Sequence, residues 1–251
     1  LEVAGLSTSG ASDVVAFTNV KAGTKISMTN NTDVSTTATY VTAATSGTAD
    51  SVSAEVSGVT ASAATDAILT IATGFETLNL NTTGSASSLG DIITTTATTL
   101  NVTGDQNLTV TSDLDATLTT INASSFTGKL DIDIADNGSP DATSGGVDII
   151  DVTITGGSGN DTIDTSTATA DVELSVDAGA GNDTVKIGQI LGEGSSTVAA
   201  DSISGGAGTD VLQTDVDYVD AGTALITGLT TVSGALSGFE TLNLIGFGNE
   251  A

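Results

Sequence analysis

Short runs of alternating apolar and polar residues recur along the chain from residue 68 onward. A period of two places one set of side chains on a buried face and the other toward solvent, as in a half-buried β-strand. Helical spacing is almost absent, and ASAATDAIL (61–69) is the one place for a short helix. The runs that predict strands are ILTIA (68–72), TLNLN (77–81), TLNVT (99–103), NLTVT (107–111), KLDIDI (129–134), DVTIT (151–155), VELSVD (172–177) and TLNLI (241–245).

The segments between these runs are rich in turn residues, namely Gly, Asn, Asp, Ser and Thr. The inward pairs of successive runs are alike, because Leu or Val occupies them at 78 and 80, at 100 and 102, and at 108 and 110. Short strands with similar inward residues predict stacked rungs of one coil. We therefore predict an all-β fold, a right-handed parallel β-helix or β-roll solenoid.

Residues 1–66 have a different sequence pattern, with fewer clearly alternating runs and a long Thr/Ala/Ser run at 36–58. We divide the chain into an N-terminal β-rich segment, 1–66, and a β-solenoid, 67–251. The sequence leaves open whether the first segment is a separate β piece or a set of degenerate rungs.

The heptapeptide GFETLNL occurs twice, at 74–80 and at 238–244, which indicates modular construction. We expect Phe75 and Phe239 to fill the core at the ends of similar rungs. The alternative is a dedicated interface role for Glu76 and Glu240.

The composition restricts the partners of the chain. Four lysines stand against 31 acidic residues, so that the net charge is −27, and His, Cys and Trp are absent. This charge excludes nucleic acid and anionic membrane surfaces, but it attracts divalent cations. Without cysteine there is neither a disulfide framework nor thiol chemistry. A hydrophobic content of 38% argues for a folded chain, and no apolar stretch is long enough for a transmembrane helix.

Three glycine- and aspartate-rich nonapeptides share the form G/A-G-x-G-x-D-x-U-x, where U is a large aliphatic residue. They are GGSGNDTID (156–164), AGAGNDTVK (178–186) and GGAGTDVLQ (205–213). One such turn alone is compatible with a linker, a phosphate cradle or a metal site, and with an ordinary solvated turn. A P-loop requires Gly-Lys-Ser/Thr before a helix, and an EF-hand requires a terminal Glu; neither is present.

Three copies in under 60 residues favour a metal site. Glycine permits the tight turns that point carbonyls inward, Asp supplies a carboxylate, and Ca²⁺ accepts six to eight such oxygens. The turns begin 22 and 27 residues apart, so we expect them to stack on one edge, with one ion between Asp161 and Asp183 and another between Asp183 and Asp210. The expected carbonyl ligands are those of Gly157, Gly159, Gly179, Gly181, Gly206 and Gly208, with Asp148, Asp164, Asp171, Asp177 and Asp201 as further candidates.

These nonapeptides resemble the calcium-binding turns of repeat-in-toxin proteins, although they cover only 156–213. The Thr/Ala/Gly/Asn-rich composition and the GFETLNL rungs are similar to bacterial surface-layer proteins of the Caulobacter type. The resemblance implies type I secretion to the outside of a Gram-negative cell and folding on calcium. It also implies a two-dimensional lattice of copies held by calcium and anchored to a cell-surface polysaccharide. The chain has only three good nonapeptides, and we expect it to be a fragment.

We therefore expect a structural, calcium-dependent surface-layer protein; the alternative is a module of a large secreted calcium-dependent adhesin. We do not expect an enzyme, because the chain has no His, Cys or Arg and neither HExxH nor GxSxG. The carboxylate pairs Asp131/Asp133 and Asp148/Asp151 are formally available to a glycosidase, but few aromatic residues are present to hold a sugar.

Overall fold

The computed structural model describes residues 1–7, 13–72, 74–134, 152–168, 174–188, 201–215 and 236–245, and these consist almost entirely of β-strands and turns. The one helical element among them is η1 (Thr42–Ala44), a single 3₁₀ turn. Residues 61–68 contain bends and turns rather than a short helix, and a strand begins at Leu69. No helix in the described ranges is long and apolar enough to cross a membrane.

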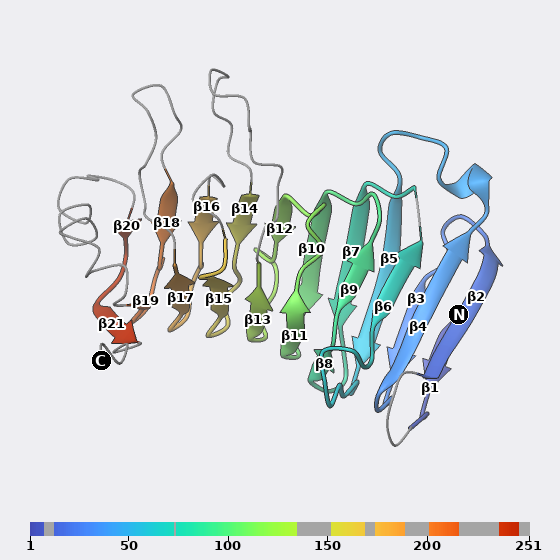
Figure 1. Cartoon of the computed structure of the whole chain (residues 1–251), viewed down its shortest axis with the longest axis horizontal. Coiled ribbons are helices and arrows are strands. Elements are labelled where there is room, and N and C mark those ends of the chain that lie inside the picture. The colour runs from blue at the N-terminus through green and yellow to red at the C-terminus, as the bar shows by residue number, and fades with distance from the viewer. Residues whose placement is uncertain are drawn as a thin grey trace, which may run out of the picture.

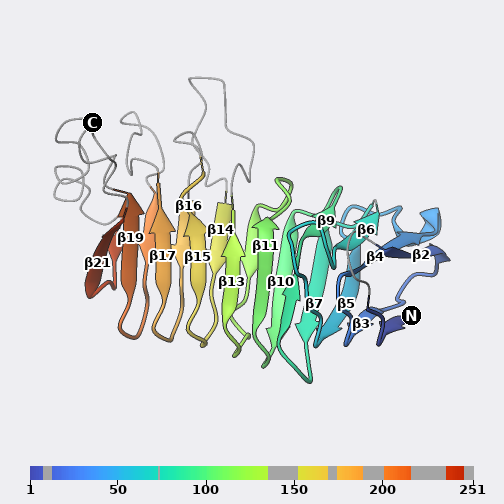
Figure 2. The ribbon, with the colours of Figure 1, turned by 60° about the horizontal axis from the view of Figure 1, so that its bottom comes forward.

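All strand pairs are parallel, and the strands form three sheets along one long axis (Figures 1 and 2). The ten-stranded sheet contains, in order, β1 (Glu2–Ala4), β3 (Ile26–Thr29), β5 (Ser51–Ser57), β7 (Thr77–Thr82), β10 (Thr99–Gly104), β12 (Thr120–Asn122), β14 (Val152–Thr155), β16 (Leu174–Asp177), β18 (Ser202–Ser204) and β20 (Leu236–Ser237).

The other side of the molecule is divided between two sheets. The four-stranded sheet contains β2 (Asp13–Val20), β4 (Val34–Tyr40), β6 (Leu69–Ala72) and β9 (Ile92–Thr94). The seven-stranded sheet contains β8 (Ser87–Leu89), β11 (Leu108–Asp113), β13 (Leu130–Asp133), β15 (Thr162–Thr165), β17 (Thr184–Ile187), β19 (Val211–Asp215) and β21 (Thr241–Ile245).

The chain alternates between the two sides and returns to the ten-stranded sheet once per coil, which is the connectivity of a parallel β-solenoid. The predicted fold class is confirmed, and each of the eight strands predicted from alternation forms within one or two residues of its expected bounds. Pairing of β5 with β7 continues the long sheet across residue 66. Whether residues 1–66 are a domain of their own stays a prediction.

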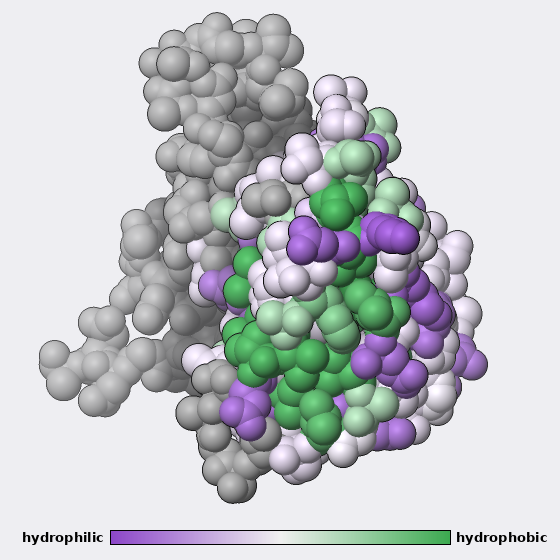
Figure 3. Space-filling view, turned by 90° about the vertical axis from the view of Figure 1, so that its right-hand side faces the viewer, coloured by the Kyte–Doolittle hydropathy of each residue, from purple (hydrophilic) through white to green (hydrophobic). Residues whose placement is uncertain are grey.

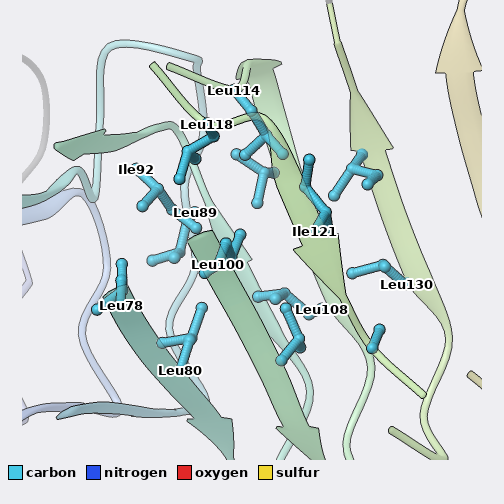
Figure 4. Packing of buried hydrophobic residues seen from close by; sticks show 14 of the residues in the cluster. Leu78, Leu80, Leu89, Ile92, Leu100, Leu108, Leu114, Leu118, Ile121 and Leu130 are labelled. Atoms are coloured by element: carbon cyan, nitrogen blue, oxygen red, sulfur yellow. The ribbon is translucent and has the colours of Figure 1, made fainter. Parts of the chain in front are cut away.

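The core is a set of aliphatic columns between the sheets. In the long sheet, Leu78 lies in register with Leu100, and Leu100 with Ile121 (Figure 4). All three side chains are at most 1% exposed. Burial of each stabilises the fold by about 1.5–3 kcal/mol relative to an exposed side chain. Phe75 is buried beside Tyr40, with ring centroids 4.8 Å apart, so the expected core position of this residue is confirmed.

The N-terminal strands fill their interior differently. Ser35 and Thr36 in β4 are buried, together with the small side chain of Ala38. The Ser35 hydroxyl accepts a hydrogen bond of 3.0 Å from the backbone N–H of Ile68. Because polar and small residues occupy inward positions here, the apolar alternation that reveals the later strands is weakened.

The two sides of the solenoid differ in charge. The outward positions of β7, β10, β12 and β14 are all Thr or Asn, and Thr77, Thr99, Thr120 and Thr153 form one in-register column. The outward positions of β13, β15 and β17 instead contain Asp131, Asp133, Asp164 and Lys186. Over these coils the long sheet is therefore uncharged and regular, whereas the seven-stranded sheet is charged.

Apolar side chains gather at the surface near β1 and β2 (Figure 3). The large hydrophobic residues exposed there are Leu1, Leu6 and Val14, with exposed fractions of 53%, 44% and 54%. At the opposite end Leu242 in β21 is 49% exposed, whereas the equivalent Leu78 in the first GFETLNL is fully buried. The first and last coils that the structure describes thus expose large apolar side chains, whereas inner coils bury theirs against neighbouring coils.

Candidate metal centre

The three nonapeptide turns stack along one edge, between the long sheet and the seven-stranded sheet (Figure 2), as predicted. Their glycines form two columns with almost no space between successive coils. A Cβ added to Gly181 would lie 2.0 Å from the carbonyl oxygen of Gly159, and one added to Gly179 would lie 2.3 Å from that of Gly157. Gly181 also has φ +132°, a conformation that side chains disfavour. Glycine is required here by close approach of backbone to backbone.

The aspartates of the turns form a buried column. Asp161, Asp183 and Asp210 are each at most 1% exposed. The Asp183 carboxylate accepts a hydrogen bond of 2.7 Å from the Asp161 N–H, and the Asp210 carboxylate accepts one of 2.7 Å from the Asp183 N–H. Each carboxylate therefore binds the backbone of the preceding coil. The aliphatic residues that follow, Ile163, Val185 and Leu212, are buried and occupy the second position of short strands.

The members of this column differ in how completely they are hydrogen-bonded. Both oxygens of Asp161 accept backbone hydrogen bonds, from Leu130 at 2.8 Å and from Gly157 at 2.9 Å. Asp183 Oδ2 and Asp210 Oδ2 are buried and have no hydrogen-bond partner within the described part of the chain. A buried carboxylate oxygen without a partner is costly, and a cation is a partner that relieves this cost.

Burial also changes the protonation of the column. Burial raises the pKa of Asp183 to about 7; the Asp161 N–H lowers it, and the neighbouring carboxylates of Asp161, Asp210 and Asp177 raise it. Burial likewise raises the pKa of Asp161, although hydrogen bonds from Leu130 and Gly157 oppose the increase. The turn is thus a place where negative charge is disfavoured unless a proton or a metal ion balances it.

A pH dependence follows for the calcium-free chain. Above about pH 7, Asp183 is charged in both the folded and the unfolded chain, and the folded state bears the cost of burying that charge. Below its ordinary pKa of 3.8, both states carry the proton and the cost disappears. In a chelator we therefore expect the free energy of unfolding to rise as the pH falls from about 7 to about 4, measured by urea unfolding. Asp183→Asn should show a smaller rise; an equal rise would contradict this role.

The donor set fits a calcium ion in part. No group of three or more acidic side chains in the described ranges gathers at one point, so a cation would take oxygens from two carboxylates and from backbone carbonyls. The Gly157 and Gly179 carbonyls lie in the turns but already accept hydrogen bonds from Ala180 at 2.9 Å and Ala207 at 2.8 Å. Ca²⁺ tolerates such mixed oxygen sets. The turns that carry the predicted ligands stack on one another, and the ligand set and the ion stay predictions.

The additional candidate ligands lie in different places. Asp177 ends β16 beside the second turn, and its carboxylate accepts a hydrogen bond of 3.2 Å from the Gly179 N–H. Asp164 points outward from β15 and pairs with Lys186 at 2.8 Å. Asp201 is buried and accepts a hydrogen bond of 2.8 Å from the Leu174 N–H. Asp148 and Asp171 lie outside the described residues.

Glu240 is a member of the column that the sequence pattern missed. Its carboxylate accepts a hydrogen bond of 2.7 Å from the Asp210 N–H, as Asp210 does from Asp183. In the first GFETLNL, Glu76 accepts a hydrogen bond of 2.7 Å from the Asp50 N–H. The usable signal was the repeat itself, because an identical heptapeptide with an acidic residue before a strand indicates a shared role for that acid.

A second acidic group lies on the outer face of the seven-stranded sheet. Asp113, Asp133 and Asp164 are in register on three successive coils, followed by Lys186. Burial raises the pKa of Asp133 to about 6, and the neighbouring Asp164 and Asp113 add to this effect while Lys186 opposes it. Asp131, the other half of the formal glycosidase pair, is bound to Lys129 at 3.0 Å. The pair Asp148/Asp151 lies outside the described residues.

The fold and this edge define the class of protein: an all-β parallel solenoid whose turns on one edge carry a buried column of carboxylates. No protein-family model matches the sequence, and comparisons with curated proteins and with solved structures found no match.

Proposed function

We propose that this chain is a structural protein of the bacterial cell surface, in which calcium ions complete the solenoid and copies assemble into a two-dimensional surface layer. The observation that carries the proposal is the pair of buried, unpartnered oxygens, Asp183 Oδ2 and Asp210 Oδ2. The same resemblance that suggests the surface layer also suggests export from a Gram-negative cell and anchoring to a surface polysaccharide.

Calcium would be held by the carboxylates of the column and by carbonyls of the stacked glycines. Parallel coils are about 4.8 Å apart, close to twice a calcium–oxygen distance of about 2.4 Å. An ion between successive coils therefore reaches both carboxylates without moving them far. When bound, it neutralises carboxylates that repel one another, so its binding free energy adds to the stability of these coils.

The distribution of charge supports assembly through particular surfaces. With a net charge of −27, copies repel one another unless cations or neutral surfaces bring them together. The outward Thr and Asn residues of β7, β10, β12 and β14 provide an uncharged, regular surface for such contacts. The exposed Leu1, Val14 and Leu242 near the two ends provide apolar ones.

The second candidate function is a module of a secreted calcium-dependent adhesin. The observation in its favour is the same flat column of Thr77, Thr99, Thr120 and Thr153, whose hydroxyls suit a hydrogen-bonding neutral surface such as a carbohydrate. In this alternative calcium has the same role in folding, but copies stay separate.

One experiment tests the proposal and separates it from the adhesin. Calcium is titrated into the chelated protein while circular dichroism follows the β-signal, and the product is imaged by electron microscopy. We expect a gain of ordered β-structure followed by regular two-dimensional arrays. Ordered monomers that retain binding to a carbohydrate surface would favour the adhesin. If neither the spectrum nor the melting curve changes with calcium or chelator, both candidate functions are contradicted.

A further inference from the structure

We propose that Glu240 is the fourth carboxylate of the column and that Glu240 and Asp210 together form a calcium site of their own. This inference rests on the calcium-dependent folding proposed above, and it adds an ion to a place where the nonapeptide pattern has already ended. The heptapeptide GFETLNL around Glu240 contains neither the G-x-G spacing nor the Asp of the three turns.

The backbone geometry places Glu240 in the column. The N–H groups of Asp161, Asp183 and Asp210 each donate to the carboxylate of the next coil, and each of these three hydrogen bonds is 2.7 Å long. The acceptors are Asp183, Asp210 and Glu240. The Glu240 carboxylate thus stands one coil beyond Asp210 in the same relation in which Asp210 stands to Asp183.

The turn around Glu240 also stacks on the third nonapeptide. A Cβ on Gly205 would lie 2.3 Å from the Gly238 carbonyl oxygen and 3.0 Å from the ring of Phe239. The Gly205 N–H donates a hydrogen bond of 2.9 Å to the Ser237 carbonyl. The extra methylene of a Glu side chain lets its carboxylate reach the Asp210 N–H from a turn that lacks the longer glycine loop.

The environment of Asp210 independently indicates a bound ligand. It is fully buried, one of its oxygens accepts the Asp183 N–H, and Oδ2 has no hydrogen-bond partner in the described part of the chain. Glu240, by contrast, lies on the exposed last coil that the structure describes. A cation that enters from solvent past Glu240 would meet the unpartnered Asp210 oxygen, and would be held by a buried carboxylate on one side and an exposed one on the other.

The first GFETLNL provides a matched control. Glu76 makes the same 2.7 Å hydrogen bond, to the N–H of Asp50. However, Asp50 is only partly buried, and its carboxylate accepts a hydrogen bond of 2.7 Å from the Gly47 N–H. The same heptapeptide therefore presents a carboxylate at both places, but only Glu240 accepts the N–H of a fully buried aspartate that has an unpartnered side-chain oxygen.

The test is the number of calcium ions that the full chain binds, measured by equilibrium dialysis with calcium alone. Glu240→Gln keeps an oxygen that accepts the Asp210 N–H but removes the charge, and we expect it to bind one ion fewer than the wild type at concentrations that saturate the wild type. Glu76→Gln should bind the wild-type number. Equal numbers and affinities for wild type and Glu240→Gln would overturn the inference, and binding of no calcium by the wild type would overturn the proposed function instead.

A second measurement does not depend on how the variants fold. In the wild-type chain labelled with ¹³C, the side-chain carboxyl resonances of Glu240 and Asp210 should move on calcium saturation, while that of Glu76 should stay in place. A Glu240 resonance that does not respond while those of Asp183 and Asp210 do would also overturn the inference.

Discussion

Removal of calcium is expected to lower the free energy of unfolding by about 2.7 kcal/mol for each ion, when the free calcium had been about 100 times the dissociation constant. With two ions between the turns, the loss is about 5 kcal/mol, a large part of the stability of a protein of this size. The measurement is urea unfolding followed by circular dichroism, with calcium and with chelator. Superimposable curves would contradict the role of the Asp column.

Two variants distinguish the contribution of the calcium ions to stability from that of the hydrogen bonds. Asp183→Asn removes the carboxylate shared by both ions between the nonapeptide turns, so the response of its unfolding to calcium should fall to that of the separate site at Asp210 and Glu240. Asp161→Asn should be less stable by about 1–3 kcal/mol even in chelator, because both Asp161 oxygens already accept backbone hydrogen bonds and an amide offers one oxygen. With calcium present the loss should be larger, because Asp161 is also a ligand of one predicted ion. An Asp183→Asn variant that responds to calcium like the wild type would exclude Asp183 as the shared ligand.

Substitution of a turn glycine should have an effect of similar size without any change of charge. Gly181→Ala places a Cβ 2.0 Å from the Gly159 carbonyl oxygen and requires a side chain at φ +132°. Two coils must move apart to accommodate it, which also separates Asp161 from Asp183. We expect a loss of about 3 kcal/mol or more in urea unfolding with calcium present.

Gly23→Ala is the matched control for that substitution. Gly23 also has a positive φ, +71°, but no atom lies within 4 Å of its added Cβ. The expected loss is therefore only the conformational term, about 1 kcal/mol. Equal losses for the two variants would show that the conformation of the backbone, rather than the close stacking of coils, makes glycine necessary in the turns.

The later strands could be predicted from sequence because their interior is aliphatic. Leu78, Leu100 and Ile121 face one another on successive coils, and an alternating pattern records this directly. The N-terminal coils were harder to predict, because the polar residues Ser35 and Thr36 are buried there, and the Ser35 hydroxyl accepts a hydrogen bond from Ile68, which is not local in the sequence. An alternating pattern records only apolar inward residues. It does not predict a strand whose inward residues are polar.

At the candidate site, the motif predicted which carboxylates stack but not how each is used. The difference between Asp161 and Asp183 depends on backbone N–H groups up to 31 residues away, such as that of Leu130. The pairing of Asp164 with Lys186 was visible in principle, since both occupy the ninth position of aligned nonapeptides. The repeat indicates a shared role for Glu76 and Glu240, but the position of Glu240 in the column becomes evident only from the stacking of the coils.

The direction of the hydrogen bonds in the carboxylate column has a consequence for how the molecule comes apart. In the column each coil donates one N–H to an acidic side chain of the coil that follows, and this contact adds to the strand pairs that join the same coils in both sheets. In such a one-dimensional array, loss of an ion weakens two adjacent coils and leaves distant ones unaffected. At low calcium, the coils of the column should therefore unfold first. The coils from β5 to β12, which have no such column, should stay folded.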